Sequence, residues 1–307
     1  MFYIAEMSMG YHGLTLIMDV KYQNTDVPVT DIHIVNNEAE ITALFDRYIG
    51  NFYQKVILVC KNESIFHQAF NSFHETQGVR HPNLLNSSAS MSKNSLTGSK
   101  CFATVQFEYR VERTVLHKHK LDVDIAIAKL CKTLFFASMP EELKVFLAHN
   151  YLTRTVKYVN EDHGRLTERS HLQSAYGALI KKECVCQGYA EAFDLIMKHE
   201  GITCYTVVGT SSNAPGATED HAWNIVTLSG GKGSFQLDVT WDSNLGPSHY
   251  DFFCKDDSFM AASHGWNRAN YPKCNSSYDV KAQAVAYINA HKPMLMVRKI
   301  PYAYFSL

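Results

Sequence analysis

Two runs of strand-forming residues, joined by a short glycine-rich segment, constrain the fold of this chain most strongly. They are residues 221–228 and 234–239, with three glycines between them. Apolar, β-branched and aromatic residues in runs of this length are typical of strands, and glycines supply the turn. The sequence therefore predicts an antiparallel β-hairpin. His221 lies opposite Asp238 in it if the turn is centred between Ser229 and Gly230, or if a bulge compensates for a longer glycine loop.

A helix is predicted before the hairpin, and it begins at a cysteine. Apolar positions 189, 193, 196 and 197 recur at helical spacing after Cys186, and Gly201 is typical of a C-terminal cap. Unpaired N–H groups and the positive end of the helix dipole favour thiolate over thiol at such a position. We therefore expect Cys186 to be a nucleophile, His221 its base, and Asp238 the acid that orients the imidazole.

Each of these residues has a structural alternative. Cys186 could be a small buried residue at a tight turn, and a packing role is expected for Cys184 nearby. His221 could be a structural histidine at a strand edge. Asp242 competes with Asp238 for the third position, and its alternative is a turn-forming acid that caps backbone N–H groups. Hairpin register favours Asp238.

Three motifs, in this order, resemble the bacterial branch of the transglutaminase-like superfamily, which groups papain-like cysteine peptidases, deamidases and cross-linking enzymes. They are Cys186-Gln187-Gly188-Tyr189-Ala190, His221-Ala222-Trp223-Asn224 and Leu237-Asp238-Val239-Thr240-Trp241-Asp242. The resemblance implies an α+β fold with a papain-related core, in which the nucleophile helix packs on an antiparallel sheet. It also implies acyl transfer from amides by a Cys186, His221 and Asp238 triad.

The same resemblance suggests residues that support the triad. The hydroxyl of Tyr176 is expected to help the backbone N–H of Cys186 bind an oxyanion, and Gln187 is expected to support that site. His264, in a His-Gly-Trp segment, is expected to be structural or at the cleft rim. Three residues are expected along the cleft wall: Trp223, Asn224 and Trp241. For the two tryptophans, a place in the core is the alternative.

Composition is that of a globular enzyme. Of 307 residues, 46% are hydrophobic and 19% charged, and the formal net charge is -1. Neither a nucleic-acid nor a membrane partner is therefore expected, and the expected partner is a protein or peptide substrate. No segment approaches the roughly twenty apolar residues of a membrane span, and residues 1–22 lack a signal pattern. We expect a cytoplasmic location, or secretion if a native leader precedes the sequence.

Metal and cofactor chemistry are not expected. Cys184 and Cys186 could form half of a zinc ligand set, and the chain has 15 histidines. There is, however, no Cys-x-x-Cys pair and no helical His-x-x-x-His, and the proposed triad already uses Cys186 and His221. The expectation is a site without metal or cofactor.

The first third of the chain is expected to form a small α+β domain, residues 1–115, ahead of a catalytic domain, residues 116–307. A boundary is expected near 112–120, and a Ser- and Asn-rich segment, residues 83–100, is expected to be a mobile loop. The predicted elements are strands at 56–59 and 104–109 and helices at 38–48, 64–73 and 123–137.

The expected reaction begins with attack of the thiolate on an amide and ends with transfer of the acyl group to an acceptor. With water as acceptor the protein is a peptidase or deamidase, which is the reaction we expect. With a lysine amine it is a protein-glutamine cross-linking transferase. A third alternative, from another class, is a binding or scaffold protein that keeps the fold.

Overall fold

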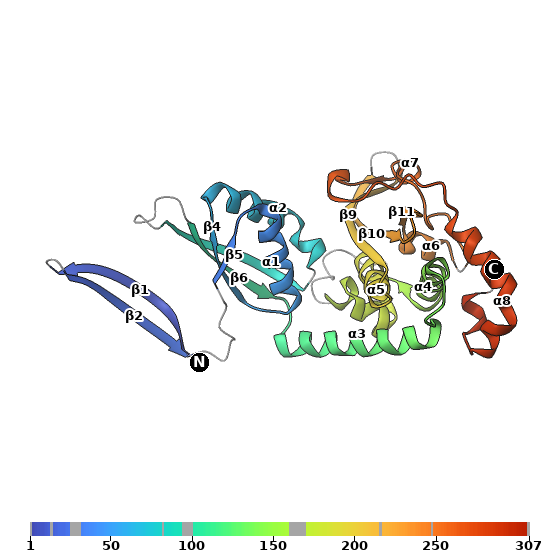
Figure 1. Ribbon diagram of the computed structural model, residues 1–307, viewed down its shortest axis with the longest axis horizontal. Helices are drawn as coiled ribbons and strands as arrows, with labels where there is room; N and C mark the ends of the chain where they lie inside the picture. The colour runs from blue at the N-terminus through green and yellow to red at the C-terminus, as the bar shows by residue number, and fades with distance from the viewer. Residues whose placement is uncertain are drawn as a thin grey trace. The chain divides into compact units, whose positions relative to one another are not determined.

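The computed structural model describes residues 2–12, 15–24, 32–81, 83–93, 101–159, 170–214, 217–246 and 248–305. The chain divides into two compact units, Met1–Glu75 with Leu84–Glu108, and Thr76–Asn83 with Tyr109–Leu307. Both units combine helices with β-sheets, as the ribbon in Figure 1 shows. The predicted α+β class is therefore confirmed.

The first unit is built on a four-stranded sheet of order β3-β4-β6-β5. Strands β3 and β4 are parallel, so the chain must cross over between them, which it does through helix α1. Phe45 of α1 meets Phe73 and Phe107 edge to face in the core. The elements are β1 (Phe2–His12), β2 (Thr15–Asn24), β3 (Ile32–Val35), α1 (Glu38–Gly50), β4 (Lys55–Cys60), α2 (Glu63–Arg80), β5 (Leu84–Lys93) and β6 (Cys101–Tyr109).

The predicted mobile loop at 83–100 is wrong for most of its length. Residues 84–93 form strand β5 at the edge of the sheet, with Leu84 and Ser87 buried. Small polar side chains are tolerated at a sheet edge because the backbone, which pairs with β6, supplies the hydrogen bonds. Residues 94–100 of the predicted loop lie outside the described residues.

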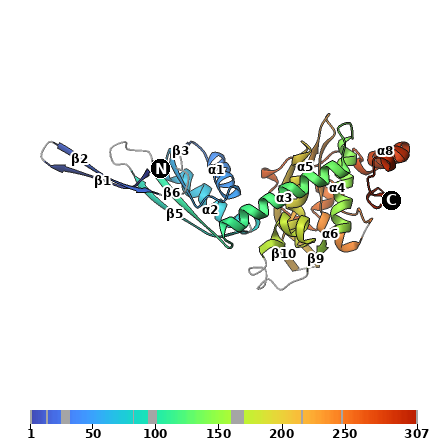
Figure 2. The same ribbon diagram turned by 90° about the horizontal axis from the view of Figure 1, so that it is seen from below.

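The second unit contains the predicted hairpin in a sheet of order β11-β10-β9-β12. Figure 2 shows helix α3 running past α5 and α4 in this unit. None of the described helices has the length and apolar character of a membrane span. The elements are α3 (Arg113–Leu134), α4 (Glu141–Thr155), β7 (Lys157–Tyr158), η2 (Ser170–Gln173), η3 (Gly177–Lys181), β8 (Glu183–Cys184), α5 (Cys186–His199), β9 (Thr203–Ala214), β10 (Ala217–Leu228), β11 (Gly233–Leu237), α6 (Val239–Leu245), α7 (Asp257–Met260), β12 (His264–Gly265), η4 (Arg268–Asn270), α8 (Val280–Val297) and η5 (Tyr302–Tyr304).

Helix α3 begins ten residues earlier than the sequence suggests, at Arg113 rather than Val123. The basic, histidine-containing segment 112–120, which contains the expected domain boundary, lies before the helix predicted at 123–137. Residues 113–120 instead form the first two turns, because Lys, Leu and Arg are all strong helix formers. Leu116 is buried within these turns.

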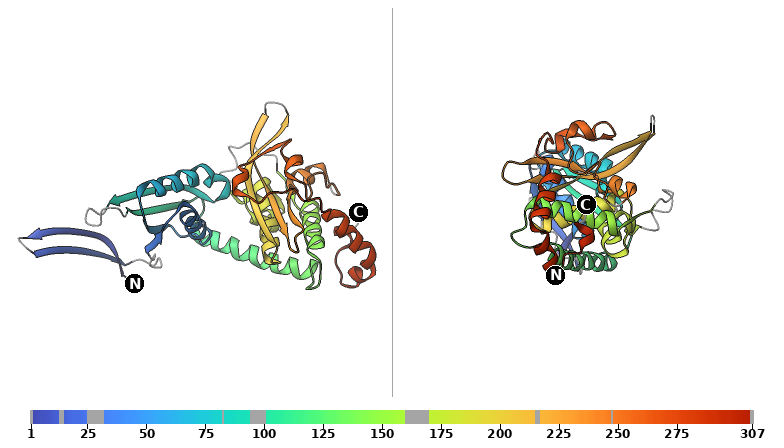
Figure 3. Two further views of the ribbon diagram at one scale, coloured as in Figure 1. Left: turned by 45° about the horizontal axis from the view of Figure 1, so that its top comes forward. Right: turned by 90° about the vertical axis from the view of Figure 1, so that its right-hand side faces the viewer.

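Helix α5 packs on β9 and β10, so the predicted arrangement of a nucleophile helix on an antiparallel sheet is confirmed (Figure 3). The apolar positions that predicted the helix are its buried face: Tyr189, Phe193, Ile196 and Met197 are all fully buried. At Gly188 a Cβ atom would lie 2.5 Å from Cys184 Cβ, so glycine permits the close approach of α5 to β8.

Candidate active site

Cys186 is the first residue of α5, directly after β8. Its N-cap, Val185, has an extended backbone and supplies no side-chain hydrogen bond to the helix start. The positive end of the helix dipole is therefore not neutralised by a capping side chain. Six of the eight cysteines are buried, and only Cys186 and Cys254 are partly exposed. Burial raises the pKa of the Cys254 thiol well above its usual range.

His221 on β10 and Asp238 form a buried hydrogen-bonded pair. Nε2 of His221 lies 2.7 Å from Oδ2 of Asp238, with 5% of the histidine side chain exposed and none of the aspartate. Burial by itself would lower the pKa of His221, but the charge and hydrogen bond of Asp238, together with Cys186, raise it to about 10. The bond through Nε2 leaves Nδ1 for exchange of a proton with Cys186.

The predicted register of the hairpin is wrong by two residues. Asn224 pairs with Leu237, so continuing the ladder places Asp238 opposite Trp223 rather than His221. Gly230 and Gly231 in the loop, and Gly233 at the start of β11, have positive φ angles, which allows a loop longer than the centred two-residue turn. Because side chains alternate with a period of two, the shift keeps the acid on the face of the sheet that carries His221.

The sequence suggested that Asp238 is a strand residue. In the structure it is the N-cap of helix α6. Its Oδ1 accepts hydrogen bonds from the backbone N–H groups of Thr240 at 2.9 Å and Trp241 at 3.1 Å. Burial would raise the pKa of this carboxyl, yet His221 and His264 hold it well below its usual range. The acid is therefore ionised and fixed in one orientation when it meets His221.

The sequence suggested that His264 is structural or at the cleft rim, but the structure places it beside Asp238 in the candidate site. Its Nε2 lies 3.2 Å from Oδ2 of Asp238, the same oxygen that His221 uses, and Ser263 Oγ lies 2.9 Å from its Nδ1. The side chain is fully buried, so it is not at a cleft rim. Pairing of β12 with β9 brings it there, with His264 opposite Ser211. The His-Gly-Trp segment was the available signal.

Asp242 belongs to a second buried pair, with His149 of helix α4. His149 Nε2 lies 2.9 Å from Asp242 Oδ2, and neither side chain is exposed. Oδ1 of Asp242 accepts a hydrogen bond of 2.9 Å from the backbone N–H of Phe252, which is the capping role considered in the sequence. The partner histidine lies 93 residues away, so no local pattern indicates it.

The two residues expected at the oxyanion site have other surroundings in the structure. The ring of Tyr176 stacks on His119 of α3 with centroids 3.7 Å apart. Gln187 is buried, and its Oε1 has no hydrogen-bond partner within the described part of the chain. Their oxyanion roles stay predictions. Tyr158 of β7 was not singled out, yet burial and the nearby Cys186 raise its pKa to about 12, which keeps its hydroxyl protonated.

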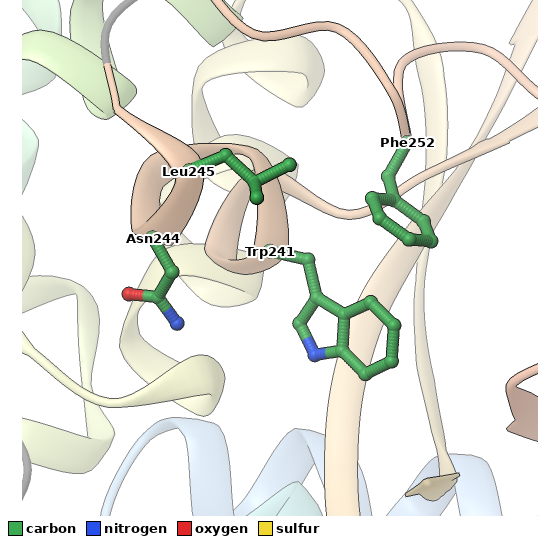
Figure 4. Close-up of a pocket in the computed structure, with 4 residues that line it drawn as sticks. All are labelled: Trp241, Asn244, Leu245 and Phe252. Atoms are coloured by element: carbon green, nitrogen blue, oxygen red, sulfur yellow. The ribbon is translucent and has the colours of Figure 1, made fainter. Parts of the chain in front are cut away.

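Of the three expected cleft-wall residues, Trp241 lines a pocket among the described residues. Trp223 is buried, with Nε1 donating to Gln236 Oε1 at 2.7 Å. Asn224 is also buried, and its Nδ2 donates to the Ala190 carbonyl at 3.0 Å, tying β10 to α5. Trp223 therefore lies in the core, the alternative kept open for it, and the wall role of Asn224 stays a prediction. The pocket, of about 200 Å³, is lined by Trp241, Asn244, Leu245 and Phe252 (Figure 4).

Two clusters of described residues carry the donor atoms that metals use. In the first, the ligand atoms of His221, Asp238 and His264 all lie within 4.8 Å of one another. Hydrogen bonds between these side chains already account for their close approach. The second is Cys131, His199 and Glu200, where Lys144 Nζ lies 2.7 Å from the glutamate and neutralises it. Absence of a metal and of a cofactor stays a prediction.

One protein family matches the part of the chain that carries this site. The sequence profile of the transglutaminase-like superfamily matches residues 130–238, a span that contains Cys186 and His221 and ends at Asp238. Residues 130–238 are therefore similar to the transglutaminase-like superfamily, as the motifs of the chain indicated. A search of curated proteins found no match.

Two solved structures are also similar to this chain. One is described as a TGase, with 14% identity and a TM-score of 0.32, covering 61% of this chain and 51% of that one. The other is a candidate cysteine protease from Cytophaga hutchinsonii, with 12% identity and a TM-score of 0.31, covering 51% of this chain and 65% of that one. Likenesses this distant say nothing of the reaction.

Proposed function

We propose that this protein is a cysteine-dependent hydrolase of protein or peptide amides, which works through an acyl-enzyme with Cys186, His221 and Asp238 as its catalytic triad. The observation that carries the proposal is the 2.7 Å bond between His221 and a fully buried Asp238, beside a partly exposed cysteine at a helix start. An imidazole oriented by an acid and facing a thiol is the arrangement that activates a nucleophile.

The first half of the reaction forms a thioester. The Cys186 thiolate attacks the amide carbonyl, and the backbone N–H of Cys186 donates to the developing oxyanion. Tyr158 is proposed as a further donor for that oxyanion, because its strand pairs with Cys184, two residues before the nucleophile. The C–N bond then breaks as Nδ1 of His221 gives its proton to the leaving amine or ammonia. Asp238 stabilises the imidazolium before this transfer.

Hydrolysis is the second half we propose. Neutral His221 accepts a proton from water, the hydroxide adds to the thioester, and the carboxylic acid leaves as the thiol of Cys186 is restored. Water requires no dedicated binding site, whereas transfer to a lysine requires a surface that selects the amine. The cross-linking transferase and the scaffold protein are therefore the alternatives to be tested.

The experiment is to incubate the protein with glutamine-containing peptides and excess primary amine, and to follow all products by mass. We expect cleaved or deamidated peptide with little amide exchange. The Cys186→Ala variant should give no product, whereas Cys254→Ala, which changes the other partly exposed cysteine, should retain activity. Dominant exchange onto the amine would establish the transferase. No acyl-enzyme with any donor would favour the scaffold protein.

A further inference from the structure

An apolar pocket adjoins the candidate active site. Its walls are Trp241, Leu245 and Phe252, with Asn244 beside them. Figure 4 shows Leu245 and Asn244 projecting from α6, Phe252 on the segment that follows, and the indole of Trp241 between α6 and Phe252. Leu245 is 50% exposed although it is apolar. Single exposed leucines are ordinary, but one that shares a hollow with two half-buried aromatic rings indicates a binding surface.

The pocket is tied to the proposed catalytic histidine through Trp241. Its indole ring lies 6.0 Å from the His221 ring and 4.5 Å from that of His264, centroid to centroid. Its backbone N–H bonds Asp238, the acid of the same site. A group seated on Trp241 is therefore next to His221 rather than on a distant face.

The opposite wall is held by the same segment of chain. The backbone N–H of Phe252 donates to Asp242, and its carbonyl accepts from the N–H of Asp238 at 3.0 Å. The ring of Phe252 meets Trp241 edge to face at 4.8 Å. Both walls are thus fixed to residues 238–242, so the pocket is formed before any ligand arrives, which lowers the entropic cost of binding.

Resting on the proposed function, we propose that this pocket binds one apolar side chain, aliphatic or aromatic, of the peptide that donates the acyl group. Its volume, about 200 Å³, is below the roughly 300–1,000 Å³ of sites for drug-sized ligands, so it matches a single side chain. The exposed amide of Asn244 can hydrogen bond the backbone of the same peptide. The substrate class is thus peptides with an apolar residue near the reactive amide.

The test compares alkylation rates of Cys186 by three electrophiles. Two are short peptidyl fluoromethyl ketones, identical except for one side chain, leucine or aspartate, and the third is iodoacetamide. We expect the leucine ketone to react about tenfold to a hundredfold faster than the aspartate ketone. Leu245→Asp should abolish that preference, and its iodoacetamide rate corrects both ketone rates for any change at the thiol itself. Leu121→Asp, which changes a leucine 57% exposed on α3, should keep the preference.

Equal rates for the two ketones in the unmodified protein would overturn the pocket, as would a preference that survives Leu245→Asp. Either result with normal iodoacetamide reactivity leaves the nucleophile in place, so the two proposals fail separately. If Cys186 proves unreactive, binding of a small ligand tests the pocket instead. In the Cys186→Ala protein, N-acetyl-leucinamide should shift the indole NMR signal of Trp241 but not that of Trp223, which is buried and bonded to Gln236. No shift of Trp241 would overturn the pocket.

Discussion

Among the described residues of the second unit, two buried aspartates four residues apart each pair with a histidine, and only one of these aspartates has the surroundings of a catalytic site. His221 and Asp238 are 2.7 Å apart, and His149 and Asp242 are 2.9 Å apart. The first pair adjoins a partly exposed cysteine at a helix start. The second is enclosed, with neither side chain exposed. The comparison teaches that a short His–Asp bond is not itself a sign of catalysis, and that access and a nucleophile make the difference.

The N-cap and first turn of helix α6 contain the two acids, so the catalytic role of Asp238 and the structural role of Asp242 depend on the same short segment. Asp238 is the N-cap of α6, and the N–H of Asp242 bonds the Asp238 carbonyl. Asp242 also holds the N–H of Phe252, whose carbonyl accepts from Asp238. We therefore interpret the pair of His149 and Asp242 as the support that fixes the backbone from which Asp238 reaches His221.

The largest expected difference is between Asp238→Asn and Asp242→Asn. Asparagine is a good N-cap, so Asp238→Asn should fold, but its amide N–H₂ faces Nε2 of His221 and imposes the wrong tautomer. Turnover should fall by about 10⁴-fold, the size of this effect in another triad. Asp242→Asn should mainly lower stability. The measurement is turnover per folded molecule, with the folded fraction taken from circular dichroism. A loss of turnover in Asp242→Asn with a loss of stability in Asp238→Asn would exchange the two roles.

Changes at the enclosed pair, His149 and Asp242, should lower the stability of the protein rather than its turnover. His149→Leu leaves Asp242 buried without its partner, and removing one member of such a pair costs about 3–5 kcal/mol of unfolding free energy. His249→Leu is the matched control, because His249 pairs with Asp251 on the surface of the same unit. An exposed pair contributes about 0–1 kcal/mol. Equal urea midpoints for the two variants would contradict the supporting role.

His264 should sharpen the comparison, because it gives Asp238 a second histidine partner, whereas Asp242 pairs with His149 and a backbone N–H. His264→Phe removes a hydrogen bond to a charged group, so turnover should fall about tenfold or more. The pKa of Asp238 should rise, which moves the acid limb of the pH–rate profile to higher pH. His264→Gln keeps an N–H donor and should restore both values. A profile unchanged in His264→Phe would reduce this histidine to a packing residue.

A pH dependence of stability is also expected from His221. Its pKa rises from its ordinary value to about 10 on folding. Its contribution is therefore complete below about pH 6.5 and is lost as pH rises toward 10. In urea unfolding, we compare the unfolding free energies of the unmodified protein and His221→Gln. The excess stability of the unmodified protein should be smaller at pH 9.5 than at pH 6. A difference between the two proteins that grows with pH would show that folding does not raise this pKa.

The sequence predicted the parts of the site that depend on local pattern. Helix α5 follows from apolar spacing after Cys186, and the hairpin follows from two strand runs around glycines. The hairpin register was wrong because glycines with positive φ angles lengthen the loop. Pairing of Asp242 with His149, and of His264 with Asp238, depends on tertiary contacts between distant segments, which local patterns do not contain. Strand β5 was missed because an edge strand needs few apolar side chains.

The most direct test of the central claim is site-specific alkylation at mildly acidic pH. The protein is treated with limiting iodoacetamide at about pH 6, where ordinary thiols with pKa near 8.5 are protonated, and intact and peptide masses locate the adduct. A thiolate paired with protonated His221 should react, giving one adduct at Cys186 and none in Cys186→Ala. An adduct at Cys254 with Cys186 unmodified, or reactivity at Cys186 that develops only above about pH 8, would contradict an activated nucleophile.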